Sequence, residues 1–358
     1  MKTTTILFAA ALLAPALSAQ GTGLTVKNGV DTYVEVAHSP TLVPPSGITL
    51  EAWVTYDGST LGTGWKSPTL VRHNMAAGKE NFFLRVEAQG SKATTLRWLV
   101  AAKSGNVIVD YRFTAGALKK WTHVAATYDG SVARIFINGK AMASRTSSRG
   151  PIKDLAGKLN VGTGNTTIAP GIEAWNGEID ELRIWPYART AAEITQTMNL
   201  ELKMMPGMVS TWNFNGDVKD SSGKNDGKMV GKLAIGANTL KLTPVPFPGS
   251  IQFGAGTKGC GLEPGTGIGS LPKLGSTLGI IGTNGAPNAA GFCLMGGARL
   301  QTPFSILGVN IYIAPTSLYL ILPTTGSTLG THRVDMPIPS DTKFKGVALN
   351  WQYLLLDT

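Results

Sequence analysis

Three carboxylates, Glu178, Asp180 and Glu181, lie within one short run that has the pattern of a β-strand. In retaining glycosidases two carboxylates about 5.5 Å apart serve as acid and nucleophile. On a strand, this chemistry places carboxylates at positions i, i+2 and i+4, because alternate residues share a face. Here Glu178 and Asp180 share a face, Leu182 takes the i+4 position, and Glu181 points to the other face. We therefore expect no catalytic residue on this strand and a non-enzymatic protein.

Two tryptophans lie in turn-rich stretches, Trp65 in GSTLGTGWKSP and Trp175 in GIEAWNGE. Exposed aromatic rings can stack on the faces of sugar rings while nearby polar groups hold the hydroxyls. Trp65 and Trp175 are therefore the candidate ligand-binding residues, and the alternative is that both pack inside their loops. The tryptophans expected in the core, because they sit in strand patterns, are Trp53, Trp98 and Trp121.

The residue types argue against a metalloprotease or nucleophile-elbow site, a zinc site and a nucleic-acid-binding surface. The four histidines are isolated in the sequence, with no HExxH pattern and no nucleophile elbow. Two cysteines are too few for a cysteine-based zinc site. The net charge of +10 is dispersed, whereas nucleic-acid-binding proteins usually cluster their basic residues. We expect no nucleic-acid partner.

The first residues have the pattern of a secretory signal peptide. A basic start precedes an apolar stretch from Ile6 to Leu17, and small residues follow at the end of the segment 1–19. The stretch is too short for a membrane anchor, and no later segment is long and apolar enough to span a bilayer. We expect a secreted or cell-surface protein. In an oxidising compartment, Cys260 and Cys293 are expected to form a disulfide.

These residues must be positioned by β-strands. From Leu24 to about Lys232 the chain consists of short alternating runs rich in Val, Ile, Thr and aromatic residues, separated by turn residues. This pattern is typical of an all-β sandwich. Asn138-Gly139 suits a tight hairpin turn, and Thr190 with Glu193 forms a capping-box pattern at the start of one short helix. In the run IDELRIW, strict alternation would separate Ile179 from Leu182 on opposite faces.

The same runs resemble the laminin-G-like, concanavalin A-like jelly-roll domains. The resemblance is carried by NGVDTYVEVAHSP, ITLEAWV, WTHVAATYDGSVARIFINGKAM, LNVGTGN and NGEIDELRIWPYARTAAEI, in that order. It implies two packed antiparallel sheets in lectin-type jelly-roll topology, here assigned to residues 20–235. The later segment MVSTWNFNGDVKDSSGKNDGKMVG also resembles a family element. It either closes the sandwich from the C-terminal side or is the remnant of a second repeat.

The resemblance also implies a calcium site. In the resembling jelly rolls an aspartate corresponding to Asp180 commonly meets a calcium ion together with the loop before the first family strand. The matching loop positions are Asn28 and Asp31, with backbone carbonyls and water completing the oxygen ligands. Relatives often carry Asp where this chain has Asn28, which lowers the negative charge of the site. The alternative is a hydrogen-bonded turn aspartate without an ion.

Beyond a proline-containing linker at 236–250, residues 251–358 become glycine-rich and carry few charges. FGAGTKGCGLEPGTGIGSLPKLGST, GFCLMGG and VDMPIPSDTKFKGVALNWQYLLLD resemble a C-terminal β domain of secreted proteins from planctomycete-type bacteria. The resembling domains usually continue past the final Leu-Asp with another strand, so either that last strand is missing here or this sequence is short. The fold class expected for the whole chain is a jelly-roll β-sandwich followed by a smaller β-sandwich.

The function expected from these features is binding. We expect a secreted, non-catalytic module for carbohydrate binding or adhesion, with an extracellular glycan or cell-surface polymer as its partner. Two alternatives remain open: a polysaccharide hydrolase or lyase of the same fold, and a purely structural cell-surface or matrix protein.

Overall fold

The chain forms two compact units. In the computed structural model, Leu17–Lys203 and Val209–Pro244 make up one, the sandwich unit; Met1–Ala16, Met204–Met208 and Val245–Thr358 make up the other, the C-terminal unit. The sandwich unit thus ends inside the segment predicted as a linker. None of the helices described is both long and apolar enough to cross a membrane. The structure describes residues 3–7, 22–26, 32–57, 65–76, 78–89, 92–114, 116–164, 173–244, 250–253, 265–269, 275–306, 309–342 and 348–355.

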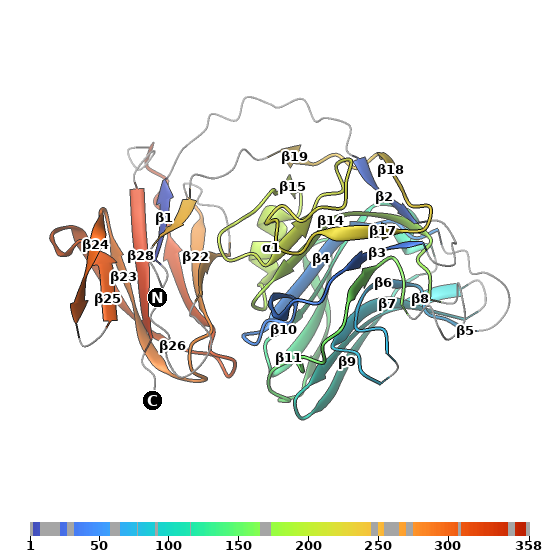
Figure 1. The fold of residues 1–358 in the computed structure, drawn as a ribbon, viewed down its shortest axis with the longest axis horizontal. Coiled ribbons are helices and arrows are strands. Elements are labelled where there is room, and N and C mark those ends of the chain that lie inside the picture. The colour runs from blue at the N-terminus through green and yellow to red at the C-terminus, as the bar shows by residue number, and fades with distance from the viewer. Residues whose placement is uncertain are drawn as a thin grey trace. The chain divides into compact units, whose positions relative to one another are not determined.

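The first sheet of the sandwich unit is antiparallel and runs in the order β12-β11-β10-β4-β14-β2-β18, with β16 also paired to β14 (Figure 1). Its strands are β12 (Lys140–Thr146), β11 (Val132–Ile137), β10 (Thr122–Tyr128), β4 (Ile48–Val54), β14 (Gly177–Trp185), β2 (Thr22–Val26), β18 (Ala234–Ala237) and β16 (Ser210–Trp212).

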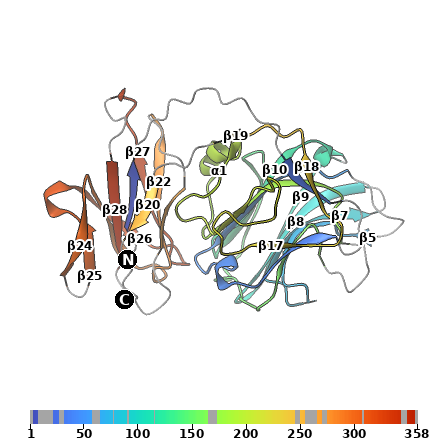
Figure 2. The same ribbon diagram turned by 45° about the horizontal axis from the view of Figure 1, so that its top comes forward.

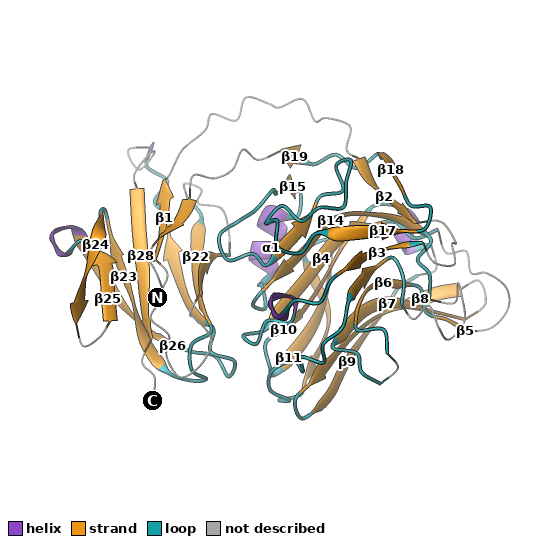
Figure 3. Cartoon of the chain, viewed as in Figure 1, coloured by secondary structure: helices purple, strands orange, loops and turns teal. Residues whose placement is uncertain are grey.

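The second sheet is also antiparallel and has the order β17-β3-β13-β6-β7-β8-β9, with β5 paired to β7 (Figure 3). Its strands are β17 (Gly227–Val230), β3 (Tyr33–Val36), β13 (Leu159–Val161), β6 (Thr69–His73), β7 (Phe82–Gln89), β8 (Lys92–Ala102), β9 (Gly105–Arg112) and β5 (Trp65–Lys66). Short elements complete the unit: β15 (Leu200–Glu201) pairs in parallel with β19 (Thr243–Pro244), and the 3-10 helices are η1 (Pro40–Leu42) and η2 (Ala117–Lys119).

One hydrophobic core fills the space between the two sheets. Alternate residues of the central strands enter it, for example Leu50 and Val54 of β4 and Leu84 of β7. Of the three tryptophans expected in the core, Trp98 of β8 is fully buried there. The expectation is wrong for Trp53 and Trp121, which are half-buried and lie outside this core. The all-β sandwich predicted from the sequence is confirmed. The outer face of each sheet is the face turned away from this core.

The segment after the helix closes the sandwich. Its strands join both sheets, because β16 pairs with β14, β18 with β2, and β17 with β3. The aromatic strand also adds Trp212, which is fully buried in the shared core. Of the two alternatives left open by the sequence, closure from the C-terminal side is therefore the correct one.

Strand β14 departs from the alternation predicted for it. Its pairing with β4 shifts register between Asp180 and Arg183, and Glu181 adopts a left-handed backbone with φ of 51°. This β-bulge adds one residue, so Ile179 and Leu182 both enter the core instead of facing opposite sides. The face assignment made for IDELRIW is wrong for this reason.

The predicted helix and hairpin turn are both present. Helix α1 (Ala191–Thr197) begins after Thr190, whose hydroxyl accepts from the backbone N–H of Glu193, while the Glu193 carboxylate accepts from the backbone N–H of Thr190. The capping box is therefore confirmed. Asn138 and Gly139 have φ of 49° and 76°, as a tight turn between β11 and β12 requires.

The C-terminal unit is also made of strands (Figure 2). Its five-stranded sheet has the order β20-β1-β28-β23-β26, and residues 3–7 of the predicted signal peptide form its second strand. A three-stranded sheet β21-β22-β27 and a two-stranded sheet β24-β25 accompany it. The bounds are β20 (Ser250–Phe253), β1 (Thr3–Leu7), β28 (Ala348–Leu355), β23 (Ala290–Gly296), β26 (Leu318–Thr325), β21 (Gly265–Ile268), β22 (Thr277–Thr283), β27 (His332–Pro337), β24 (Arg299–Ile306), β25 (Val309–Ile313) and the 3-10 helix η3 (Pro315–Ser317).

The β domain predicted for the C-terminal region is confirmed, but its disulfide stays a prediction. Cys293 of β23 is a buried free thiol in this structure. Burial raises the pKa of this thiol to about 12. Its expected partner, Cys260, lies outside the described residues.

Candidate functional site

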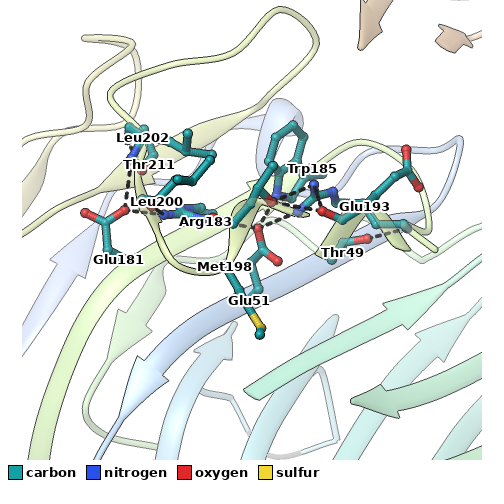
Figure 4. Close-up of polar contacts among 12 residues, drawn as sticks. Thr49, Glu51, Glu181, Arg183, Trp185, Glu193, Met198, Leu200, Leu202 and Thr211 are labelled. Carbon is teal, nitrogen blue, oxygen red and sulfur yellow. Dashed lines mark hydrogen bonds and ion pairs between the residues drawn. The ribbon is translucent and has the colours of Figure 1, made fainter. Parts of the chain in front are cut away.

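The outer face of the first sheet is closed by α1 and the segment that follows it. Ile194 of α1 packs on Ala125 and Phe136 of the sheet, and the Trp53 indole donates to the carbonyl of Met198. Beneath this cover lies a buried polar network centred on Glu51 (Figure 4). A ligand cannot reach this network without displacing the helix.

Glu51 is held by two arginines and a tryptophan. Its Oε1 accepts from Trp185 Nε1 and from Arg189 Nη1, each at 2.8 Å, and lies 3.8 Å from Arg183 Nη1. Burial alone would raise the pKa of Glu51, but the nearby charges, Arg189 first, hold it below its ordinary value. Burial lowers the pKa of the neighbouring His123 to about 4, so that histidine is neutral at pH 7. The network is a structural tie between sheet and helix.

The carboxylates of the bulge are also occupied. The Asp180 oxygens accept from Asn238 Nδ2 at 2.9 Å and from the backbone N–H of Glu181 at 2.8 Å. Glu181 accepts from Arg183 and Asn213. Burial, followed by the charge of Glu181, raises the pKa of Asp180 to about 8. Neither side chain is open to a substrate, since both are almost fully buried.

The calcium expectation rests mostly on residues whose placement is not described. Asn28 and Asp31 lie outside the described residues, and of the three expected ligands only Asp180 is placed. Within the described ranges, no group of three or more His, Cys, Asp or Glu side chains is arranged to hold a metal ion. The calcium site remains a prediction.

The outer face of the second sheet carries three arginines on adjacent strands, which we call the arginine row: Arg72 of β6, Arg85 of β7 and Arg97 of β8. Arg72 lies opposite Phe83 in the ladder, and Arg85 lies opposite Arg97. Residues directly opposite each other share a face of the sheet. The row therefore crosses the strands side by side on the face away from the core.

Carboxylates alternate with these arginines. Glu173 lies 3.2 Å from Arg72 and 3.7 Å from Arg85. Glu87 lies 2.8 Å from Arg85 and 3.0 Å from Arg97. The chain of ion pairs is completed at its two ends by Glu80, 2.9 Å from Arg72, and Asp110, 2.7 Å from Arg97. Three positive and four negative side chains thus hold one another in fixed positions.

Exposure increases along the row. The Arg72 side chain is 4% exposed, Arg85 17% and Arg97 28%. The Arg85 guanidinium also lies 4.3 Å from the centre of the Phe83 ring, a cation–π contact. The Arg85–Arg97 end of the row therefore presents oriented hydrogen-bond donors and acceptors to solvent.

Asn160 of β13 lies beside Arg72 in the ladder and opposite Glu35 on its other side. It is fully buried, and neither its amide nitrogen nor its amide oxygen has a hydrogen-bond partner. A buried polar group left unpaired costs about 1–3 kcal/mol. Such a cost in a native protein is a reason to examine a position for function.

The predictions for the two candidate tryptophans, Trp175 and Trp65, stand differently against the structure. Trp175 is fully buried, its indole N–H donates to the carbonyl of Thr55 at 3.0 Å, and its ring packs on Tyr56. The prediction that Trp175 stacks on a sugar is wrong, because the loop folds its ring into the core. Trp65 lies on β5, opposite Gln89 of β7, at the edge of the second sheet. Its side chain lies outside the described part, so its role remains a prediction.

The arginine row was not predicted from the sequence. Its signal is present in FFLRVEA and TLRWLVA, where charged residues alternate with core residues. Arg85, Glu87 and Arg97 are the outward positions of those runs. The partner Glu173 is distant in sequence and could not be assigned from spacing alone.

Residues 28–195 match the family model Laminin_G_3, described as the concanavalin A-like lectin/glucanases superfamily. The sandwich unit has the corresponding jelly-roll fold, and the resemblance seen in the sequence is confirmed. A search of curated proteins found no match.

Solved structures with a similar fold come from several sources. A candidate carbohydrate-binding protein from Bacteroides ovatus is 18% identical, with 62% of this chain and 61% of that chain covered and a TM-score of 0.47. A SAP-like pentraxin from Limulus polyphemus is 13% identical, with 67% and 97% covered and a TM-score of 0.44. The CBM40 of a Ruminococcus gnavus IT-sialidase, bound to α2,3-sialyllactose, is 16% identical, with 48% and 94% covered and a TM-score of 0.36. The chain spans about three fifths of the Bacteroides protein.

Proposed function

We propose that this protein is a non-catalytic carbohydrate-binding module whose site is the arginine row on the outer face of the second sheet. The observation that carries the proposal is the continuous chain of ion pairs from Arg72 to Asp110. Its members are already held in place, so a ligand meets ordered donors and acceptors. The family match over residues 28–195 supports a role of this class.

The charge balance of the row favours a neutral glycan. Four carboxylates against three guanidinium groups leave no excess of positive charge to attract an anionic polymer. Sugar hydroxyls both donate and accept hydrogen bonds, and can therefore use arginine and carboxylate together. Asn160 would gain partners of the same kind if the groups covering it move aside.

The test is binding of the purified protein to an array of neutral and acidic glycans, followed by calorimetry on the best ligand. Arg97→Ala and Arg85→Ala should weaken binding at least tenfold. The matched control is Arg134→Ala, since Arg134 forms an ion pair with Asp129 at 3.1 Å outside the row. No glycan bound, or equal losses in Arg97→Ala and Arg134→Ala, would reject this site.

Asn160→Leu gives a second, independent readout. Leucine has a similar size and no polar group, so it removes an unpaired buried amide rather than a hydrogen bond. We expect stability to be kept or raised while glycan affinity falls. A loss of stability without a loss of affinity would make Asn160 a structural residue only.

Secretion and calcium are parts of the same proposal. We propose that residues 1–19 direct export and that a calcium ion links Asp180 to the loop containing Asn28 and Asp31. Mass spectrometry of the exported protein would identify its first residue. A melting temperature that is unchanged by EDTA and by added calcium would reject the ion.

A hydrolase or lyase gains no support from the bulged strand, because Asp180 and Glu181 are buried and hydrogen-bonded. We expect the glycan that binds to be recovered unchanged. Release of reducing ends or of unsaturated products during incubation would reject the non-catalytic assignment.

A further inference from the structure

The two sheets of the sandwich unit meet along one side at their edge strands, β9 of the second sheet and β12 of the first. Arg145 of β12 donates to the carbonyl of Ile108 on β9 at 3.4 Å. Four residues further along the chain, Arg149 donates to the carbonyl of Ser104 at 3.1 Å. The contacts move backward along β9 as the chain advances, so the two segments run in opposite directions along this side.

Positive charge gathers along this side of the sandwich unit. Residues 103–153 contain nine lysines and arginines and only two acidic residues, so they carry most of the net charge of +10. Six of the nine are exposed and lie on β9, on β12 or in the turns that follow β8 and β12. We call these six the basic edge: Lys103, Arg112, Lys140, Arg145, Arg149 and Lys153. The fold thus brings together charges that are dispersed along the sequence.

The basic edge lacks a counter-charge of its own. Within the described part of the chain, none of its six side chains forms an ion pair. The carboxylates near it in the sequence lie beside other groups: Asp110 is 2.7 Å from Arg97, Asp129 is 3.1 Å from Arg134, and Asp154 is 3.7 Å from His38. In the arginine row, by contrast, each guanidinium lies between two carboxylates. The edge therefore presents uncompensated positive charge to a ligand.

Neutral groups hold the Arg149 guanidinium in place. Besides its bond to β9, it donates from Nε to the hydroxyl of Ser147 at 3.1 Å. The hydroxyl of the buried Tyr128 lies 2.9 Å from the carbonyl of Gly130 and 2.8 Å from that of Gly150. This hydroxyl ties the turn that follows Arg149 to the turn between β10 and β11. Hydroxyl and carbonyl partners orient a guanidinium without cancelling its charge, so Arg149 can still pair with an acid group.

We propose that the basic edge binds a linear polysaccharide that carries carboxylate groups. A strand rises about 3.3 Å per residue, so the side of β9 from Ser104 to Arg112 is about 25 Å long. Positive charges spread over this length match an extended polymer with spaced acid groups better than a single small anion. Carboxylate is also the group that the neighbouring Arg97 binds through two hydrogen bonds, on Asp110. The basic edge shares no residue with the arginine row, and this proposal does not rest on that site.

An acidic polysaccharide fits this edge better than a nucleic acid or a membrane does. Single-stranded nucleic acids stack their bases on aromatic side chains, but Tyr111 and Phe113 on this side are half-buried against the core. Double-stranded DNA carries a charge about every 1.7 Å. The contact points of Arg145 and Arg149 on β9 are four residues, or about 13 Å, apart. A lipid surface needs an apolar face, and Met142 is the one large apolar side chain exposed within the described residues of 103–153.

The test is binding of the purified full chain to polygalacturonate, measured by affinity electrophoresis and calorimetry. We expect binding at about 0.1 M salt that is lost at about 1 M, because the screening length falls from about 10 Å to about 3 Å. The double variant Arg145→Gln with Arg149→Gln should weaken binding about fivefold or more at the lower salt. A second double variant, Lys103→Gln with Lys153→Gln, should act in the same direction. Neither lysine side chain forms a hydrogen bond with the described residues, so this variant should keep its melting temperature.

The matched control is Lys224→Gln with Lys228→Gln, which removes the same charge near β17, at the opposite end of the second sheet from β9. This control should bind polygalacturonate almost as tightly as the unchanged chain. No binding of polygalacturonate, equal losses in the edge and control variants, or equal retention by neutral dextran would overturn the proposal. Tighter binding of double-stranded DNA or of phosphatidylglycerol vesicles would overturn it too, since the edge would then serve one of those partners.

Discussion

At the scale of single residues, the two outer faces of the sandwich differ in how far their paired charged side chains are exposed. The Glu51 network is fully buried, and the charge of Glu51 is paired with Arg183 and Arg189, which ties the sheet to the helix. The arginine row is held together in the same way, yet its Arg97 end remains exposed. Pairs of arginine and carboxylate therefore hold the fold together on the first sheet and, in our proposal, bind a ligand on the second sheet.

The Glu51 network makes a stability prediction. Glu51→Gln should destabilise the protein by about 3–5 kcal/mol, because it removes the buried carboxylate that lies against both Arg183 and Arg189 and leaves less negative charge to balance them. Urea unfolding followed by tryptophan fluorescence measures the loss. The matched control is Glu35→Gln, whose partner Lys158 is 58% exposed, and it should leave the midpoint almost unchanged. Similar losses of unfolding free energy in both variants would show that the buried ion pairs of Glu51 contribute no more to stability than an exposed pair.

A second residue-scale prediction concerns pH. Burial first, and then the nearby His38, lowers the pKa of His73 to about 3. The unfolded chain binds this proton near pH 6.5 and the folded chain does not, so stability should fall as the pH drops from 6.5 toward 3. At pH 5.5 this amounts to roughly 1 kcal/mol.

His73→Asn tests this assignment, since it removes the titration at one position. The free energy of unfolding should decrease less between pH 7.5 and 5.5 in the variant than in the unchanged protein. His123 will keep part of the slope in both, because burial also lowers its pKa, to about 4. Parallel pH profiles for the two proteins would refute the contribution of His73.

At the scale of elements, the sequence predicted what depends on local patterns. The alternating runs became strands, Asn138-Gly139 became a turn, and Thr190 with Glu193 capped the helix. The bulge at Glu181 was not predictable, because it depends on pairing with β4, and nothing in IDELRIW marks an extra residue. The candidate site shows the same limit, since Glu173 reaches Arg72 only through the fold.

The contact of the hairpin turn with α1 gives an element-scale prediction. Gly139 has φ of +76°, and a Cβ there would overlap the hydroxyl of Thr195. Gly139→Ala should therefore cost more than about 1 kcal/mol, from backbone strain and from the clash. The control is Gly236→Ala, where a Cβ meets no atom within 4 Å. Thermal unfolding should show a lower melting temperature for Gly139→Ala alone, and equal values would contradict the packing.

At the scale of the whole molecule, the predicted leader and the C-terminal unit are connected. β1 pairs antiparallel with both β20 and β28, so residues 3–7 fill a position between them. On β28, Trp351 and Gln352 face opposite sides of the sheet and are both fully buried. β28 is thus a central strand, and export with removal of residues 1–19 would turn one of its sides into an edge.

We therefore expect the backbone amides of Leu349–Gln352 to exchange faster in the chain that begins at Gln20 than in the uncleaved chain, because the β1 ladder is absent. Thr5→Pro in the uncleaved chain should act in the same direction, since proline cannot donate to the ladder and disturbs a central strand. A peptide of residues 1–10 added to the shorter chain should restore protection. Equal exchange in the two chains would mean that another strand, or β20 itself, pairs with β28 once the leader is gone.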